Sequence, residues 1–213
     1  KYVYGLTATP KRQDGHHPIL YMYLGSIRYQ VDARLQAEKR PFAHLMIPRF
    51  TGMRFHLDEN SKSPAIVQYY GQIMLDDLRN HPFVEDVLHC EEEGRSCLLL
   101  SDRTQHVKLL AELLQKAGQS VHVLLGGQTN AQMRNQLLAL KDAAAPVIVC
   151  ATGQFIGEGF DDSRLDTLFL TMPISWRGTL AQYVGRLHRL HEGKREVRVY
   201  DYIDVNAAML EKM

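Results

Sequence analysis

Two arginines, a glutamine and a glycine form the pattern QxxGRxxR between Gln182 and Arg189. On a helix, Arg186 and Arg189 are three residues apart and share a face, on which Gln182 also lies because it is one turn earlier. Guanidinium groups hold phosphate oxygens through paired hydrogen bonds, and Gly185 leaves room for a phosphate or a second backbone. The pattern therefore predicts a clamp for a polyphosphate. A solvated amphipathic helix explains the same residues and stays open as an alternative.

A second candidate site is the stretch Ala151–Asp161, which follows an apolar run and contains three glycines in seven positions. Successive backbone N–H groups in such a loop can hold an anion, and the Asp161 carboxylate could accept hydrogen bonds from ribose hydroxyls. The alternative is a glycine-rich turn in which the acidic pair at 161–162 caps the next element. A third stretch, Gly5–Pro10, is typical of a strand that ends in a hydroxyl-rich turn.

The composition is that of a folded protein without a dominant charge. Among 213 residues, 25 Lys and Arg balance 24 Asp and Glu, and 45% are hydrophobic, which argues against disorder and against a strongly basic nucleic-acid binder. Positive charge gathers locally between Trp176 and Arg198, where it could form a phosphate-binding face or only a solvated surface. No apolar run is long enough to span a membrane and no signal peptide is visible, so we expect no membrane partner.

Several kinds of site are missing from the sequence. Three scattered cysteines, Cys90, Cys97 and Cys150, do not make a disulfide framework, which favours a reducing cytoplasm. No CxxC pair occurs, so we expect no metal site, and Cys150 is typical of a core position. There is no GxxxxGK[ST] P-loop, no GxGxxG after a strand and no GxSxG, so neither a phosphate-binding P-loop nor a hydrolase nucleophile is indicated.

The second half of the chain alternates between short apolar runs and segments with helical periodicity. We expect strands and helices in turn over 97–101, 102–116, 121–125, 129–140, 146–151, 167–172, 179–190 and 197–203, with a capping box from Thr129 to Gln132. This order predicts an α/β fold whose mainly parallel sheet is covered on both faces. Ligands of such sheets bind beyond the carboxyl ends of the strands. The candidate binding residues therefore lie at 101–103, 126–128, 152–154 and 173–177.

The first 95 residues are less regular. We expect strands over 2–6, 27–31 and 44–50, the last extending towards Phe55. We also expect helices over 17–24, from Pro64 onwards and from Pro82 towards Glu93, because proline favours the first turn of a helix.

In this order and at this spacing, the stretches resemble the motifs of superfamily 2 helicases. The resemblance spans nearly the whole chain and is closest to the DEAD/DEAH-type group that includes type III restriction helicase subunits and the XPB- and UvrB-like enzymes. Gly5–Pro10 resembles motif III, Leu98–His106 motif IV, Ala151–Asp161 motif V with an EGxD core, and Gln182–Arg189 motif VI.

The resemblance implies a RecA-like three-layer αβα sandwich and a division of the chain. Residues 1–26 would be the end of helicase lobe 1 and a linker, and residues 27–213 would be the C-terminal lobe. ATP and Mg²⁺ would be bound mainly by lobe 1 of the same polypeptide, whose P-loop and acidic box are missing here. The chain alone would then not hydrolyse ATP, and its other partner would be nucleic acid, with DNA favoured.

The resemblance also implies a role for each motif residue. Arg186 and Arg189 would be arginine fingers, and Gln182 would sense the γ-phosphate. The nucleotide would meet Glu158, Gly159 and Asp161. The nucleic-acid backbone would face Ser101, Arg103, Gly126, Gly127 and Thr152, and Thr7 and Thr9 would couple the ATP state to strand movement.

Two other functions fit the residues less well. A RecA-like lobe could bind nucleic acid or protein without turnover, although the presence of Gln182, Arg186 and Arg189 favours a motor. A nucleotide-dependent enzyme on another parallel α/β fold, such as a transferase, would need a nucleophile or base of its own, and none stands out.

Overall fold

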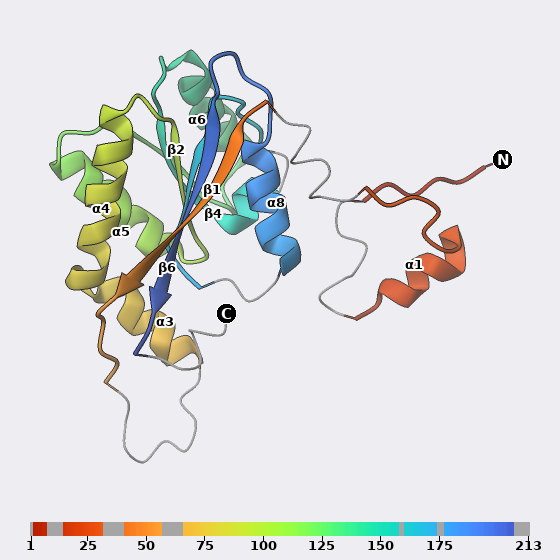
Figure 1. Cartoon of the computed structure of the whole chain (residues 1–213), viewed down its shortest axis with the longest axis horizontal. Coiled ribbons are helices and arrows are strands. Elements are labelled where there is room, and N and C mark those ends of the chain that lie inside the picture. The colour runs from red at the N-terminus through yellow and green to blue at the C-terminus, as the bar shows by residue number, and fades with distance from the viewer. Residues whose placement is uncertain are drawn as a thin grey trace.

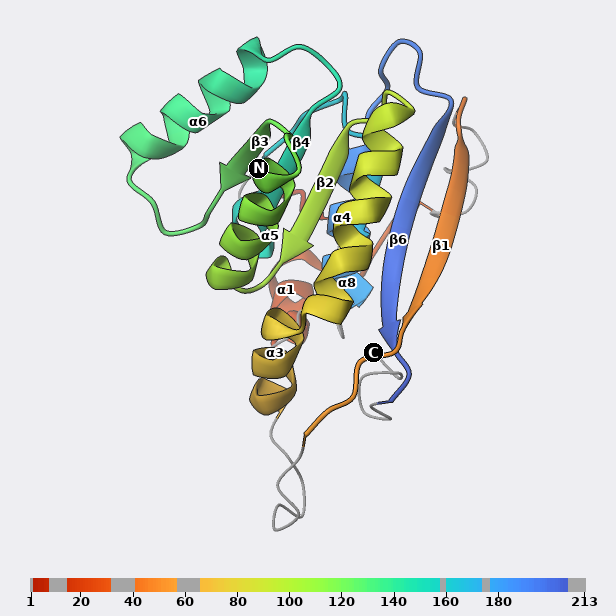
Figure 2. The same ribbon diagram turned by 90° about the vertical axis from the view of Figure 1, so that its left-hand side faces the viewer.

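Six parallel strands form one sheet in the order β1-β6-β5-β2-β4-β3 (Figures 1 and 2). The computed structural model describes residues 2–7, 15–31, 41–56, 66–157, 160–173 and 177–206. The strands are β1 (Ala43–Thr51), β2 (Cys97–Ser101), β3 (Val121–Leu124), β4 (Ile148–Thr152), β5 (Thr167–Leu170) and β6 (Glu196–Asp204). The helices are α1 (His17–Leu24), α3 (Ile66–Leu75), α4 (Asp77–Glu92), α5 (Thr104–Lys116), α6 (Asn130–Asp142), α7 (Gly153–Gly157) and α8 (Arg177–Leu187).

The sheet has a hydrophobic core on each face, because successive side chains of a buried strand point in opposite directions. On β2, Leu98 and Leu100 join the core that contains Tyr183 and Leu187 of α8. Leu99 points the other way, into the core that contains side chains of α4 and α5. In Figure 2, α4 and α5 accordingly lie in front of the sheet and α8 behind it. The predicted three-layer α/β fold with a parallel sheet is confirmed.

Most elements of the second half lie where the sequence predicts them. β2 and β4 are buried along their whole length, as their apolar runs indicate. The predicted capping box is present at the start of α6, where the Thr129 hydroxyl accepts from the Gln132 N–H and the Gln132 side chain accepts from the Thr129 N–H. The His17–Leu24 helix and the strand around 44–50 are also confirmed.

Four local predictions are wrong. Residues 2–6 and 27–31 are not strands, because no described strand pairs with them and a strand needs a hydrogen-bonded neighbour. Pro82 lies inside α4, which begins earlier because the Asp76 carboxylate accepts from the Arg79 N–H at 2.7 Å. β1 ends at Thr51 and does not reach Phe55. The predicted helix start at Pro64 lies outside the described residues.

Two further differences bear on the motifs. The glycine-rich stretch after β4 is not simply a loop, because it begins with the single helical turn α7. α8 ends at Leu187, so Arg189 lies in the turn beyond it and does not share a helical face with Arg186. The segments 2–7 and 15–31 lie apart from the sheet (Figure 1), and their large apolar side chains, such as Leu6 and Met22, are exposed. The division of the chain at residue 26 stays a prediction.

Candidate functional site at the carboxyl edge of the sheet

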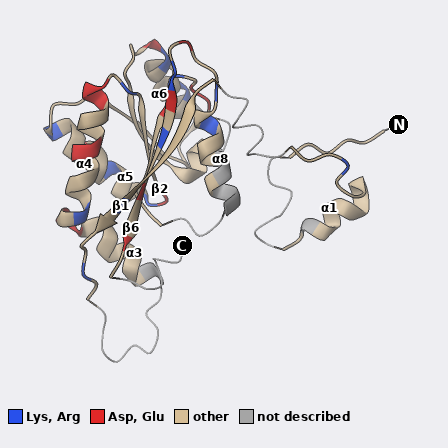
Figure 3. Cartoon of the chain, viewed as in Figure 1, with Lys and Arg blue, Asp and Glu red and all other residues tan. Residues whose placement is uncertain are grey.

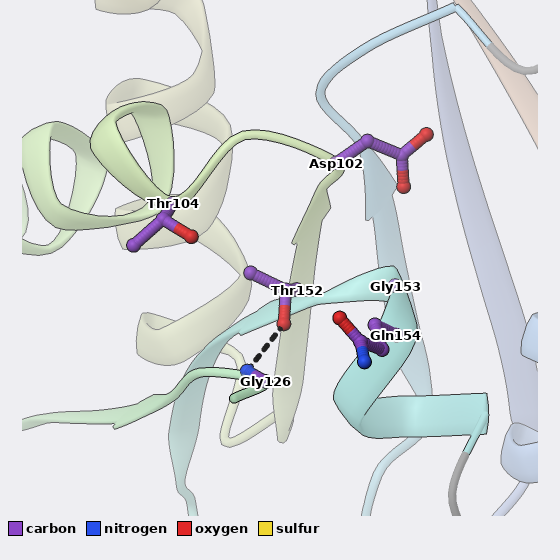
Figure 4. A pocket seen from close by; sticks show the side chains of 6 residues that line it. All are labelled: Asp102, Thr104, Gly126, Thr152, Gly153 and Gln154. Atoms are coloured by element: carbon purple, nitrogen blue, oxygen red, sulfur yellow. Dashed lines mark hydrogen bonds between the residues drawn. The ribbon is translucent and has the colours of Figure 1, made fainter. Parts of the chain in front are cut away.

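A pocket of about 120 Å³ lies where β2, β3 and β4 end (Figure 4). Its lining comes from the three segments that follow these strands, which the sequence predicts as binding segments. The lining residues are Asp102, Thr104, Gly126, Thr152, Gly153 and Gln154. Of the residues assigned to nucleic acid from the motifs, Gly126 and Thr152 line this pocket, whereas Ser101, Arg103 and Gly127 lie in the same segments beside it.

The ends of β3 and β4 are joined inside the pocket. The Gly126 N–H donates to the Thr152 hydroxyl at 2.9 Å, which orients the hydroxyl and uses one acceptor position. A Cβ at Gly126 would lie 2.9 Å from the Gln154 side chain, so only glycine fits without displacing that side chain. The next residue, Gly127, has a φ of +75°, which glycine adopts without strain. The glycine pair thus lets the chain turn closely over β4.

A second close approach brings α8 to the pocket. A Cβ at Gly153 would overlap the Tyr183 hydroxyl and would lie 2.7 Å from an Asp102 carboxylate oxygen. Burial and the nearby Asp102 charge raise the pKa of Tyr183 to about 12. Burial also raises the pKa of Asp102, and the Arg103 cation partly opposes this. The sequence indicates Tyr183 only as a core residue, because its contact with Gly153 is thirty residues away in the chain.

Ser101 and Arg103 have different surroundings although they are two residues apart. The Ser101 side chain is buried, and its hydroxyl accepts from the Arg103 N–H at 3.2 Å and lies 3.1 Å from Nδ1 of His106. The other ring nitrogen of His106 lies 3.1 Å from the Asn80 amide oxygen. Arg103 is exposed, and its guanidinium lies 5.5 Å from the centre of the Tyr70 ring. Arg103 is therefore accessible to a phosphate, whereas the Ser101 hydroxyl forms its hydrogen bonds within the protein.

Two of the predicted ATP-side residues, Arg189 and Asp161, form an ion pair. Nε of Arg189 lies 3.1 Å from a carboxylate oxygen of Asp161, and these side chains are 57% and 42% exposed. Arg186 is half-buried in the last turn of α8. Gln182 lies on the same helix, but its side chain is outside the described part of the structure, as are residues 158 and 159. Thr7 is exposed and Thr9 lies outside the described residues, so their predicted coupling role stays a prediction.

The basic stretch near the carboxyl terminus has many of its charges engaged within the protein. Arg198 contacts Glu93 and Glu196 at 2.6 Å each, and Lys194 donates to backbone carbonyls. Figure 3 shows both basic and acidic positions on the elements around the sheet. Among the described residues, no three His, Cys, Asp or Glu side chains are close enough to hold a metal ion, and no helix is long and apolar enough to cross a membrane. Cys150 is buried, as its apolar surroundings in the sequence predict.

Comparison with known proteins finds helicase relatives among viruses, while no protein-family model matches the sequence. The chain is 22% identical to D10 of Escherichia phage T5, named a probable helicase, over 86% of this chain and 45% of that protein. It is 24% identical to protein 22 of Sulfolobus islandicus filamentous virus, also named as a helicase, over 93% of this chain and 37% of that protein. It is 23% identical to L396 of Acanthamoeba polyphaga mimivirus, which carries the name of an ATP-dependent RNA helicase, over 100% of this chain and 40% of that protein. The chain thus spans less than half the length of each relative.

Solved structures show the same fold. T4 UvsW has a TM-score of 0.59 and 19% identity, over 76% of this chain and 32% of that one. The C-terminal part of the Fun30 ATPase domain has a TM-score of 0.55 and 14% identity, over 64% and 43%. The C-terminal domain of the DEAD-box protein Dbp5 has a TM-score of 0.52 and 12% identity, over 77% of both chains. The chain is therefore similar in sequence to viral proteins named as helicases, and it shares its fold with the C-terminal domain of Dbp5 and with part of T4 UvsW.

Proposed function

We propose that the chain is the C-terminal lobe of an ATP-dependent motor that moves along or separates nucleic acid, and that Arg186 and Arg189 are its arginine fingers. An arginine finger stabilises the charge that develops on the transferred phosphoryl group and its neighbours. The phosphate-binding P-loop and the carboxylates that hold Mg²⁺ would come from lobe 1, since neither motif occurs in this chain.

The observation that supports this proposal most is the ion pair between Arg189 and Asp161. It joins motif VI to motif V at 3.1 Å, although the two residues are 28 positions apart. Both side chains are about half exposed, and an ion pair at the surface stabilises the protein by only about 0–1 kcal/mol. Arg189 can therefore leave Asp161 for a phosphate at little cost, while Asp161 keeps the guanidinium near the place where it would act.

The pocket at the ends of β2, β3 and β4 supports a nucleic-acid partner. Its hydroxyls and backbone groups can bind sugar and phosphate atoms, which every base sequence shares. Arg103 lies in the chain between two residues that line this pocket, and its exposed guanidinium would meet a phosphate. We propose DNA as the substrate, with RNA as the alternative because one viral relative carries the name of an RNA helicase.

The test measures ATP turnover by the complete protein with single- and double-stranded DNA and RNA, using this chain alone as the blank. We expect one nucleic acid to stimulate turnover, and we expect Arg189→Ala to lower the stimulated rate by about 10³-fold with little change in ATP affinity. Arg189→Lys keeps the charge but loses the forked geometry, so it should recover only a small part of the rate.

Three results would decide against the proposal. Near-normal turnover of Arg189→Ala would remove the finger role from that residue. A folded complete protein without turnover under every condition would favour a non-catalytic binding module. A nucleic-acid affinity that did not fall with added salt would contradict contacts to the phosphate backbone.

A further inference from the structure

Arg189 needs support that α8 does not supply. The helix ends at Leu187, and residues 188–194 leave it in turns. A catalytic side chain must be held within a fraction of an ångström of its working position, which is harder on a turn than on a helix. Some other group must therefore fix the backbone of Arg189.

The ammonium group of Lys194 makes the required contacts. Its Nζ atom donates to the Leu187 carbonyl at 3.0 Å, to the Arg189 carbonyl at 2.9 Å and to the Leu165 carbonyl at 2.8 Å. An ammonium group has three N–H donors, so all three are used. The Leu187 carbonyl belongs to the last turn of α8, where carbonyls lack helical partners and the helix dipole favours a cation. Lys194 thus gives the Leu187 carbonyl at the end of α8 a hydrogen-bond donor and also holds the backbone of Arg189.

The third contact anchors the turn to the body of the lobe. Leu165 is fully buried and lies just before β5. Arg164, beside it, donates to the carbonyls of Ala143 at 2.6 Å and Leu140 at 2.8 Å, and it pairs with Asp162. The segment 160–166 is therefore tied to the end of α6 as well as to the sheet. The hydrogen bond from Lys194 to Leu165 therefore connects the turn with Arg189 to a well-anchored segment.

The same segment holds the side chain of Arg189. The Asp161 carboxylate forms an ion pair with the Arg189 guanidinium. The Leu165 carbonyl accepts a hydrogen bond from the Lys194 ammonium group, which also donates to the Arg189 carbonyl. The segment 160–166 thus holds the backbone of Arg189 through Lys194 and the side chain of Arg189 through Asp161. Neither contact is visible in the sequence pattern, because Lys194 and Leu165 are separated by 29 positions.

We propose that Lys194 is a positioning residue, which fixes the backbone of Arg189 so that its guanidinium can reach the γ-phosphate. This inference rests on the proposed function. In this proposal, Lys194 contacts neither the nucleotide nor the nucleic acid and acts only through Arg189. Loss of the ammonium should therefore slow the chemical step and leave ATP binding nearly unchanged.

The test uses the complete protein in four forms: unaltered, Lys194→Met, Arg189→Ala and the double variant. In steady-state assays with saturating nucleic acid and varied ATP, we expect Lys194→Met to lower kcat about 10- to 100-fold with a KM for ATP within about twofold. In the Arg189→Ala background the same change should alter the rate by less than about threefold, because the residue that Lys194 positions is gone. Lys116→Met, which removes an exposed lysine from the last turn of α5, is the matched control and should have no effect.

A purely structural lysine gives a different pattern. Equal losses in both backgrounds, a raised KM with an unchanged rate constant, or no loss at all would each overturn the positioning role. If Lys194→Met does not fold, Lys194→Gln keeps two donors and should show a smaller loss with the same dependence on Arg189. An unaltered protein without turnover, or an Arg189→Ala variant with full turnover, would instead reject the proposed function itself.

Discussion

The carboxyl edge of the sheet has two halves of opposite construction. The closed half, at the ends of β1 and β6, is filled by Arg79, which donates to both carboxylate oxygens of Asp204 at 2.7 and 3.1 Å and to the Thr171 carbonyl at 2.8 Å. The Thr51 hydroxyl donates to the same carboxylate at 2.5 Å. Both charged side chains are completely buried. No solvent or ligand reaches these groups.

The open half, at the ends of β2, β3 and β4, contains the pocket. Glycine stands at two of its close approaches, and hydroxyls and backbone groups face the space that remains. Among the described residues, polar groups therefore lie in both halves of the edge, and those that line a pocket lie in the open half. The difference teaches that a buried ion pair can fill one part of such an edge while close glycine approaches leave a pocket at the other, which is where we propose that nucleic acid binds.

The largest expected effect comes from opening the closed half. Arg79→Met leaves the Asp204 carboxylate buried without its cation, which should lower the free energy of unfolding by about 3–5 kcal/mol. Urea unfolding of this chain, followed by circular dichroism, measures the change. Arg103→Met, an exposed arginine at the open half, is the matched control and should change it by less than about 0.5 kcal/mol.

A double variant separates the ion pair from simple packing. Asp204→Leu combined with Arg79→Met removes both charges, so it should regain a substantial part of the lost stability. If Arg79→Met alone cost less than about 1 kcal/mol, the closed half would not be held by its ion pair, and the comparison of the halves would fail.

A smaller effect is expected from filling the open half. Gly153→Ala places a methyl group against the Tyr183 hydroxyl, and such overpacking typically costs about 1–3 kcal/mol. Tyr183→Phe removes that hydroxyl, so the double variant should be more stable than Gly153→Ala alone. Thermal unfolding of the three variants gives the coupling between the residues. Strict additivity of the two changes would show that the contact does not limit the space at Gly153.

Much of this fold follows from local patterns in the sequence. β2 and β4 are apolar runs because both faces of the sheet are covered, and the Thr129 capping box marks the start of α6 through side chains three residues apart. The two strands predicted before residue 32 failed because apolar composition cannot supply a neighbouring strand. The prediction of a helix start at Pro82 rests on the preference of proline for the first turn of a helix, which does not reveal that Asp76 caps α4 and that α4 begins at Asp77.

The site itself was predictable only in part. The rule that ligands bind after parallel strands points to the segments around Gly126 and Thr152, and the structure has a pocket there; that a ligand binds in it stays a prediction. The contacts that shape the edge join residues far apart in the chain, such as Arg79 with Asp204, 125 positions away. The hydrophobic periodicity of a sequence does not indicate which residues pair over such a separation. The sequence predicts a helix that continues past Arg189, because the helical pattern does not show that α8 ends at Leu187.

His106 connects the two halves, since it lies between Asn80, which follows Arg79, and Ser101, which ends β2. The hydrogen bonds fit a neutral ring: Nε2–H donates to the Asn80 oxygen and Nδ1 accepts from the Ser101 hydroxyl, which in turn accepts from the Arg103 N–H. Burial, with the Arg79 cation as the second cause, lowers the pKa of His106 to about 3. The ring therefore stays uncharged in the folded protein throughout the physiological range.

The smallest expected effect is a pH dependence that His106 adds to stability. In the unfolded chain the ring takes up a proton below its ordinary pKa of about 6.5, whereas in the folded protein it does not until about pH 3. The unfolded state thus binds more protons between these values, and stability falls as the pH is lowered through that window. Relative to His106→Gln, the unaltered chain should lose about 1 kcal/mol more between pH 6 and pH 5, measured by urea unfolding at each pH. Equal slopes for the two proteins would mean that the folded state also protonates His106, and that the link between the halves tolerates a charge.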